Sequence, residues 1–254
     1  MFGLNNHRGS CWINACLQAF FRIPEVQERY KQSSFEYLNP VDEYLHRIYK
    51  SKGQDGLKQF FESIKTSTMP AGEGIGDSNE LFLHLCDKLK FLDDLCRFKI
   101  ADTIECDNCK VKQVKEDTVT EFQLSSSGKF VEISQCISNT VQPQKVDKWK
   151  CDKCNQLGCT KQQLIGSFPK VMIFHMVTPQ TSVNYSSLLV LNSKRYALSS
   201  VICYNGSHWW TRARDMPPGS PWHTLDDSHV TNHGAQKFPV SNMMRMLIYY
   251  RLEN

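Results

Sequence analysis

The sequence lacks any apolar run long enough to cross a membrane. A bilayer-spanning helix needs about 20 consecutive apolar residues, and no stretch of the 254-residue chain approaches that length. The first 21 residues also lack the apolar core of a signal peptide, because Asn5, Asn6, His7 and Arg8 interrupt them. We therefore expect neither a membrane partner nor export.

The chain is also poor in net charge, internal repeats and low-complexity sequence. Thirty Lys and Arg against 26 Asp and Glu give a net charge of +4, spread along the chain. That balance does not indicate a nucleic-acid footprint, so no nucleic-acid partner is expected, although it suits an acidic protein surface. A hydrophobic content of 41% and a charged content of 22% are ordinary for a soluble globular protein.

Cysteine, by contrast, is plentiful. Eleven cysteines are an odd number, and the chain has no export signal. Thiol or metal chemistry in a reducing compartment fits this usage better than a disulfide framework. We expect the protein in the cytoplasm, the nucleus or both.

The pattern of apolar residues changes from helical to strand-like near residue 98. Residues 1–65 carry three amphipathic helical sets, and Asp77 and Glu80 form the ends of a capping box that opens a fourth helix. From Phe98 onward the pattern alternates, over 98–104 and again over 111–124. Further strands are predicted over 168–177, 196–204, 208–214, 222–225 and 244–252. Helices first and strands later indicate an α+β fold.

The helix predicted after Ser10 carries a cysteine at its first position. Ser10 is a favourable N-cap, and Pro24 is expected to end the run. Cys11 would therefore lie at the positive end of the helix dipole, where a thiol pKa can fall and a nucleophilic cysteine can form. The alternative is a small buried side chain, which is common for cysteine.

Two C-x-x-C pairs, Cys106/Cys109 and Cys151/Cys154, lie among polar residues. Four thiolates are the tetrahedral set that Zn²⁺ prefers in closed structural sites. Because the pairs are far apart in sequence, the strands between them must fold back as a long ribbon. We expect a structural zinc here, while a ligand exchange with nearby Cys159 stays open.

A cysteine nucleophile needs a base and a group that orients the base. His208 follows the turn Asn205-Gly206-Ser207 and begins an aromatic strand. The loop 215–221 can return the chain so that a second strand, which ends in Asp226 and Asp227, lies beside the first. This hairpin would place an aspartate beside the His208 ring.

Three separated boxes together resemble the catalytic domain of ubiquitin-specific proteases. Residues 3–18 (GLNNHRGSCWINACLQ) are similar to the family pattern G-L-x-N-x-G-N-T-C-[WY]-x-N-x-x-L-Q. Residues 206–210 and 222–230 are similar to G-x-H-[YW] followed by W-x-x-[FL]-[DN]-D-x-x-V. Residues 76–82 resemble Q-x-D-A-x-E-F with Gly76 and Asn79 off-pattern, and residues 246–251 resemble the closing strand.

The resemblance implies a role for each matching residue. It implies that Cys11 is the nucleophile, His208 the general base and Asp226 the group that orients the base. Asn6 matches the position that donates to the oxyanion, and Asp227 matches a second, supporting acidic position. Arg8 and Gly9 depart from the pattern, which has glycine and asparagine there. Arg8 could change the mouth of the cleft and help to keep Cys11 ionised.

The resemblance also implies a hand-like, papain-like cysteine protease fold in one domain, 1–254. Residues 1–97 would form a helical thumb with the nucleophile, 98–165 zinc-bearing fingers, and 166–254 a β-rich palm with the histidine and aspartate. The implied activity is thiol-dependent hydrolysis of the isopeptide bond after the C-terminal glycine of ubiquitin or a ubiquitin-like protein. We expect that modifier and its conjugates as partners, and a monomer.

Two other readings stay open. One is a catalytically silent zinc-ribbon protein that keeps this fold and only binds a partner. The other is a papain-like endopeptidase, since Gly9-Ser10-Cys11-Trp12 also matches the segment around that family's nucleophile. There the base lies about 130–150 residues downstream and its partner is asparagine. Here His208 lies much farther along and the partner is an aspartate.

Overall fold

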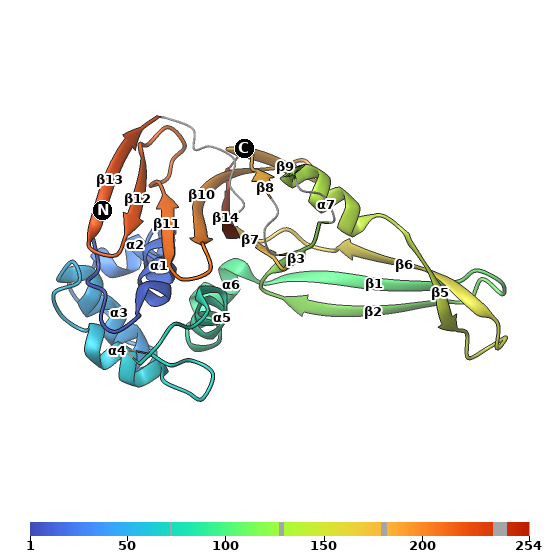
Figure 1. Ribbon diagram of the computed structural model, residues 1–254, viewed down its shortest axis with the longest axis horizontal. Helices are drawn as coiled ribbons and strands as arrows, with labels where there is room; N and C mark the ends of the chain where they lie inside the picture. The colour runs from blue at the N-terminus through green and yellow to red at the C-terminus, as the bar shows by residue number, and fades with distance from the viewer. Residues whose placement is uncertain (72, 127–129, 179–181, 236–242, 254) are drawn as a thin grey trace.

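The amino-terminal part of the chain is a cluster of helices. The computed structural model describes residues 1–254 except 72, 127–129, 179–181, 236–242 and 254. The helices of the cluster lie together at one end of the molecule (Figure 1): α1 (Cys11–Phe20), α2 (Pro24–Lys31), α3 (Pro40–Lys50), α4 (Leu57–Ile64), α5 (Ser78–Lys88) and α6 (Lys90–Cys96). The four helices that the sequence pattern predicts correspond to α1, α3, α4 and α5, whereas the pattern does not predict α2 and α6 as separate helices.

Helix α1 is the centre of this cluster. The sequence predicts one apolar stripe, but all ten residues of α1 are buried, because α5 covers one side and strand β11 (Trp209–Ala213) the other. The Thr211 hydroxyl donates to the Ala15 carbonyl at 2.7 Å and joins the helix to that strand. Pro24 does not end α1. It lies at the first turn of α2, where its missing N–H has no intrahelical partner to lose.

A large sheet packs against the helices. Its strands run in the order β13-β12-β11-β10-β14-β7-β3, with β9 paired to β10, and β3 pairs with β7 in parallel while the other pairs are antiparallel. The remaining bounds are β3 (Phe122–Leu124), β7 (Val171–Met176), β9 (Leu188–Leu191), β10 (Lys194–Tyr204), β12 (Trp222–Asp226), β13 (His229–Gly234) and β14 (Met244–Arg251). One face of this sheet completes the core that contains α1.

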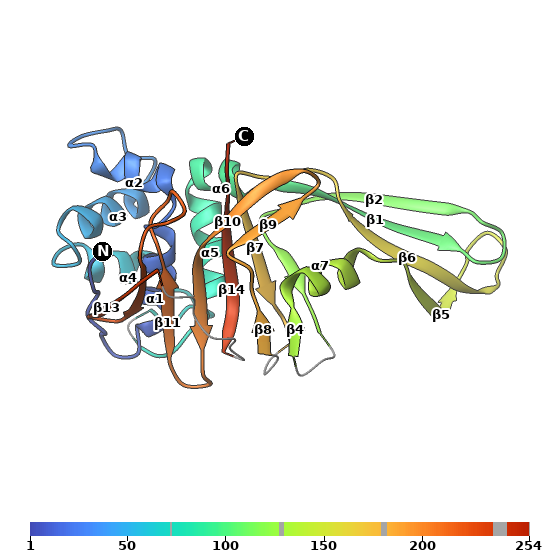
Figure 2. The same cartoon turned by 90° about the horizontal axis from the view of Figure 1, so that it is seen from above.

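A second, four-stranded sheet extends away from this body (Figures 1 and 2). Its order is β2-β1-β6-β5, all antiparallel, with β1 (Phe98–Cys106), β2 (Lys112–Val119), β5 (Gln144–Lys150) and β6 (Leu157–Ile165). Its side chains are largely exposed in β2 and β5, so hydrogen-bonded pairing rather than a thick core holds it. This is the folded-back ribbon that the spacing of the cysteine pairs requires.

The stretch between the two halves of that ribbon returns to the body. The alternation over 111–124 predicts one strand, but the chain leaves the ribbon after β2 and enters the large sheet as β3. Helix α7 (Ile133–Val141) and the pair β4 (Phe130–Glu132) with β8 (Ser182–Asn184) follow, and none of these has a counterpart in the sequence pattern. Residues 98–165 therefore contribute to both the ribbon and the body. Among the described residues, no helix is long and apolar enough to cross a membrane.

Candidate active site and cysteine cluster

The turn before α1 presents Cys11 as the first helical residue. Ser10 is at the N-cap, as predicted, but its side chain makes no capping bond. Instead the Ser10 hydroxyl accepts the N–H of His7 at 2.9 Å, and the Ser10 N–H donates to Asn6 Oδ1 at 3.0 Å. Arg8 lies in the left-handed region at φ 51°. These bonds close residues 6–10 into a compact turn that delivers the chain into the helix.

The surroundings of Cys11 raise the pKa of its thiol. It is buried, and burial raises its pKa above the ordinary value, while the Asp227 carboxylate raises it further. The backbone N–H groups of Trp209 and Trp12 oppose this by favouring the thiolate. The expectation of a lowered thiol pKa at a helix N-terminus is therefore wrong for this resting structure, because desolvation outweighs the N–H groups.

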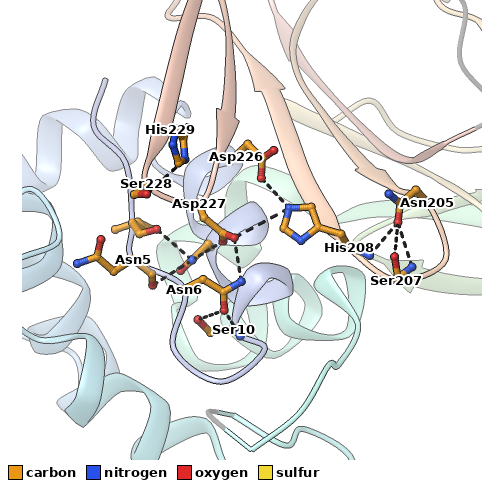
Figure 3. A network of polar contacts seen from close by, with 12 residues as sticks. Asn5, Asn6, Ser10, Asn205, Ser207, His208, Asp226, Asp227, Ser228 and His229 are labelled. Atoms are coloured by element: carbon orange, nitrogen blue, oxygen red, sulfur yellow. Dashed lines mark hydrogen bonds and ion pairs between the residues drawn. The ribbon is translucent and has the colours of Figure 1, made fainter.

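The predicted hairpin places His208 beside an aspartate. Strands β11 and β12 pair antiparallel, with Thr211 opposite Leu225, so the residues before β11 lie beside the end of β12. The His208 Nε2 atom lies 2.6 Å from Asp226 Oδ1 (Figure 3). Asn205 Oδ1 accepts the N–H groups of Ser207 and His208, which shapes the turn that carries the ring. A carboxylate on Nε2 leaves Nδ1 as the nitrogen available for proton transfer.

Asp227 ties the amino-terminal segment to the β12–β13 turn. Its carboxylate accepts Asn6 Nδ2 at 2.8 Å and Asn14 Nδ2 at 2.7 Å, and its carbonyl accepts the N–H of Leu4 at 2.9 Å. Figure 3 shows the Asp227 carboxylate between Asn6 and the His208 ring, whose Nε2 is 4.0 Å from Asp227 Oδ2. Asp227 adopts φ 51°, which turns the chain sharply enough to aim its side chain inward.

The five residues singled out by the sequence thus come from three distant segments to one place. The ligand atoms of His208, Asp226 and Asp227 lie within 4.8 Å of one another, and Asn6 joins them through Asp227. Cys11 is adjacent through the N–H of Trp209, the residue after His208. Among the hydrogen bonds of the described residues, none joins the Cys11 thiol to the His208 ring. Catalytic bonds of this kind are often long before substrate binds.

Asn14 belongs to this network but had no role in the sequence-based interpretation. Its Nδ2 donates to Asp227 and to the carbonyls of Leu4 and Asn5, both at 3.2 Å. One turn later, Gln18 Nε2 donates to the carbonyl of Phe2 at 2.6 Å. A buried amide must find partners, so two amides four residues apart in an otherwise apolar helix are the signal that could have revealed this anchor.

The off-pattern residues also have structural explanations. A Cβ atom on Gly76 would lie 2.9 Å from the Trp12 ring, so the indole fills the space that a side chain would need. Trp12 Nε1 donates to the Gly74 carbonyl at 3.1 Å, which ties the loop before α5 to the nucleophile turn. Asn79 Nδ2 lies 3.2 Å from His175 Nδ1 and joins α5 to the sheet.

The four predicted cysteine ligands meet at the far end of the ribbon. Cys106 and Cys109 lie at the β1–β2 turn, and Cys151 and Cys154 at the β5–β6 turn. Both turns have the same form: the residue after the second cysteine, Lys110 in one and Asn155 in the other, has a left-handed backbone and donates its N–H to the first cysteine's carbonyl.

The sulfur atoms of this cluster are close enough to share an ion. Cys106 Sγ lies 3.7 Å from Cys154 Sγ, Cys109 Sγ lies 3.7 Å from Cys151 Sγ, and all four lie within 4.8 Å of one another. These four cysteines can therefore hold a metal ion. Cys159 lies opposite Cys106 in the β1–β6 ladder and is not a member of the group found among the described residues.

Comparison with known proteins identifies hydrolases that are similar to this chain. The chain matches the ubiquitin carboxyl-terminal hydrolase family over residues 2–249. It is 23% identical over 209 residues to ubiquitin carboxyl-terminal hydrolase 47 of Drosophila melanogaster, which covers 68% of this chain. The chain spans only 13% of the length of that relative.

Two solved structures share the fold over the whole chain. One is the SAGA module Ubp8/Sgf11/Sus1/Sgf73 bound to monoubiquitin, with a TM-score of 0.84, 14% identity and 69% of that chain covered. The other is the same module bound to ubiquitin aldehyde, with a TM-score of 0.80, 14% identity and 70% covered. The expected hand-like fold is therefore confirmed. Because the family match extends over nearly every residue, the chain belongs to the ubiquitin carboxyl-terminal hydrolase family.

Proposed function

We propose that the chain is a thiol-dependent hydrolase that cleaves the isopeptide bond after the C-terminal glycine of ubiquitin or a ubiquitin-like protein. One observation carries this proposal: the His208–Asp226 pair and the Asn6–Asp227 pair converge beside Cys11 from separate segments. A buried thiol with no catalytic role would need neither an oriented imidazole nor a tethered amide next to it. The match to the hydrolase family supports the same activity.

The first step that we propose is attack by sulfur. His208 Nδ1 takes the proton of the Cys11 thiol, and the sulfur attacks the carbonyl carbon of the glycine. Asp226 holds the ring through Nε2 and stabilises the imidazolium that forms. The carbon–nitrogen bond then breaks as His208 returns the proton to the lysine Nζ, which leaves a thioester on Cys11. His208 next takes a proton from water as the water oxygen attacks the thioester carbon. The carbon–sulfur bond then breaks, the glycine carboxylate is released, and His208 returns the proton to the Cys11 sulfur.

Asn6 is suited to stabilise the oxyanion of both steps. One N–H of Asn6 Nδ2 donates to the Asp227 carboxylate, and Asn6 Oδ1 accepts the N–H of Ser10, so the Asn6 amide cannot rotate freely. The second N–H of Nδ2 remains to donate to the developing negative charge. Fixed donors of this kind need no reorganisation during the reaction, which is why they contribute strongly.

We further propose that the ion held by the four cysteines is Zn²⁺ in a structural role. Tetrahedral zinc with Zn–S bonds of about 2.3 Å places its sulfurs about 3.8 Å apart, and both short Sγ–Sγ distances here are 3.7 Å. Four thiolates leave no open position for a reacting water. When bound, the ion would join the two turns at the end of the ribbon, which we expect to contact the globular modifier.

Modifier-based probes test the catalytic proposal. Ubiquitin and several ubiquitin-like proteins, each with a thiol-reactive group at the C-terminal glycine, are offered to the protein, and adducts are located by mass spectrometry. We expect an adduct at Cys11 with at least one of them. Cys16→Ala is the matched control, because Cys16 is fully buried on the same helix. The absence of an adduct with every probe would overturn the proposal. Labelling that is lost in Cys16→Ala would show that Cys16, rather than Cys11, is the nucleophile.

The same probes, together with hydrolysis of a modifier that carries a C-terminal fluorophore and of unmodified peptides, separate the two other interpretations. A silent zinc-ribbon protein would bind a modifier without forming an adduct or releasing a C-terminal fluorophore. A papain-like endopeptidase would cleave unmodified peptides and leave the modifier probes intact. The aspartate on His208, rather than an asparagine, favours the modifier hydrolase over the endopeptidase.

A further inference from the structure

A pocket of about 370 Å³ lies beside the nucleophile turn and is used by none of the chemistry above. Its floor is apolar and consists of the largely buried side chains of Leu57, Phe61 and Ala71. The His7 ring stands edge-on to Phe61, with 6.5 Å between the ring centroids, and closes one side. We call this cavity, between the nucleophile turn, α4 and the loop before α5, the thumb pocket.

The thumb pocket is firmly connected to the turn that carries Cys11. Gly9 lies against the backbone of Gly74, where a Cβ atom would be only 3.2 Å from the Gly74 carbonyl carbon. Arg8 is three residues before Cys11, and three residues of chain span at most about 11 Å. The pocket wall is therefore within reach of groups attached to a substrate whose carbonyl is at Cys11.

Of the charged residues around the pocket, some form ion pairs and others do not. Glu73 is neutralised by an ion pair with Lys65. Arg8 is exposed and, within the described part of the chain, makes no hydrogen bond or ion pair. Lys58 and Glu62 on α4 also form no ion pair with another described residue. The charged residue nearest to Cys11 in the sequence, Arg8, is thus a cation with no partner among the described residues. An acidic side chain would complement it.

The direction of approach identifies the occupant. If the ribbon contacts the globular modifier, the modifier's tail reaches Cys11 from that side. Helix α4 lies in the helical cluster, on the other side of the body from the ribbon (Figure 1). Groups beyond the scissile bond, on the lysine side, would therefore extend toward α4. Each residue adds roughly 3.5 Å, so residues one to three positions from the modified lysine cover the distance to Arg8.

We propose that the thumb pocket binds the target protein next to its modified lysine, with an acidic residue facing Arg8 and an apolar side chain over Leu57 and Phe61. This inference rests on the proposed function, because only a conjugate has such a lysine side. The pocket would then select among conjugates of one modifier according to the sequence around the lysine.

Conjugates that differ only on the lysine side test this. Ubiquitin is joined through its C-terminal glycine to the lysine of short fluorescent peptides, with Asp, Ala or Lys at the two following positions. Each kcat/KM is divided by that for ubiquitin with a C-terminal aminocoumarin, which has no residues on that side. We expect the acidic peptide to exceed the basic one by about three- to tenfold, a range consistent with exposed charge pairs whose sign is reversed.

Two charge-reversal variants complete the design. Arg8→Glu should abolish or invert the preference, whereas Lys194→Glu should keep it, because it changes the net charge equally on an exposed residue of β10 outside the pocket. Equal rates for acidic and basic peptides, or a preference that survives Arg8→Glu, would overturn the inference. If the aminocoumarin substrate is still hydrolysed in that case, the proposed function stands. Failure to hydrolyse any substrate made with ubiquitin or with a ubiquitin-like protein would overturn both.

Discussion

Asp226 and Asp227 are neighbours whose replacement by asparagine should affect stability and activity to different extents. Asn is the informative substitution at Asp227 because it tolerates the left-handed backbone of that residue. It nevertheless presents one oxygen and one NH₂ where the carboxylate accepts two amide donors, from Asn6 and Asn14. One of those donors must then face another donor.

The magnitude follows from the two bonds. A hydrogen bond to a charged acceptor contributes about 1.5–3 kcal/mol when buried. Asn14 is buried and Asn6 is exposed, so we expect the amide to keep Asn14 and to release Asn6. The remaining bond also loses its charge. We expect Asp227→Asn to lower the free energy of unfolding by about 2 kcal/mol, which corresponds to a fall in Tm of about 4–8 °C for a chain of this size.

Asp226 should behave differently because about half of its side chain is exposed and its hydrogen bond is to His208. Asp226→Asn should change the stability by less than about 1 kcal/mol. It should lower kcat by less than about 100-fold, because an asparagine Oδ1 can still accept the Nε2–H of His208, although it stabilises the imidazolium less than a carboxylate does.

Urea unfolding and hydrolysis of ubiquitin aminocoumarin, measured on the same preparations, provide the assay. The expected result is that Asp226→Asn is as stable as the wild type and keeps the greater activity of the two variants. Asp227→Asn should be less stable and at least about 100-fold slower, because Asn6 is released. The reasoning is refuted if Asp227→Asn unfolds at the wild-type urea concentration, or if Asp226→Asn is the less stable of the two.

Other expected outcomes follow from single contacts. Asn6→Ala should lower kcat by about 100- to 1000-fold with little change in KM. If fluorophore release and binding of the modifier probe fell by the same factor, an oxyanion role for Asn6 would be contradicted. Because burial raises the pKa of Cys11, its alkylation without substrate should be slower than that of free cysteine at pH 7.5 and should still rise above pH 9; a plateau below pH 8 would show the opposite shift. Metal analysis should find about one zinc per chain, and Cys151→Ser should remove it. Gly76→Ala should destabilise the protein by about 1–3 kcal/mol through Trp12, which urea unfolding followed by tryptophan fluorescence can measure.

The helices and main strands could be predicted because their signals are local. The apolar periodicity after Ser10, the capping Asp77 and the apolar run over 168–177 each depend on neighbouring residues. The capping prediction is confirmed, because the Asp77 carboxylate accepts the N–H of Asn79 at 2.7 Å. The two C-x-x-C turns are local as well, because four residues suffice to present two thiols.

Elements that depend on distant partners were not predictable in the same way. Residues 111–124 alternate continuously, yet the chain changes sheets within them because Phe122 and Leu124 find parallel partners on β7. Strand β13 carries mostly exposed polar residues and exists because it pairs with β12. Helix α7 lies on the ribbon and the body at once, and no signal in its own residues revealed that packing.

By itself the sequence determined the chemistry that is available: a cysteine at a helix start, a histidine and an aspartate on one hairpin, and four thiols in two turns. The tertiary structure alone decided how these groups are held. It made Asn14 an anchor and Asp227 a clamp, and it raised the Cys11 pKa through burial. It also built the thumb pocket beside Arg8. The physical reason is that residue type and local pattern set what a side chain can donate or accept, whereas burial and distance between remote segments set which partners it meets.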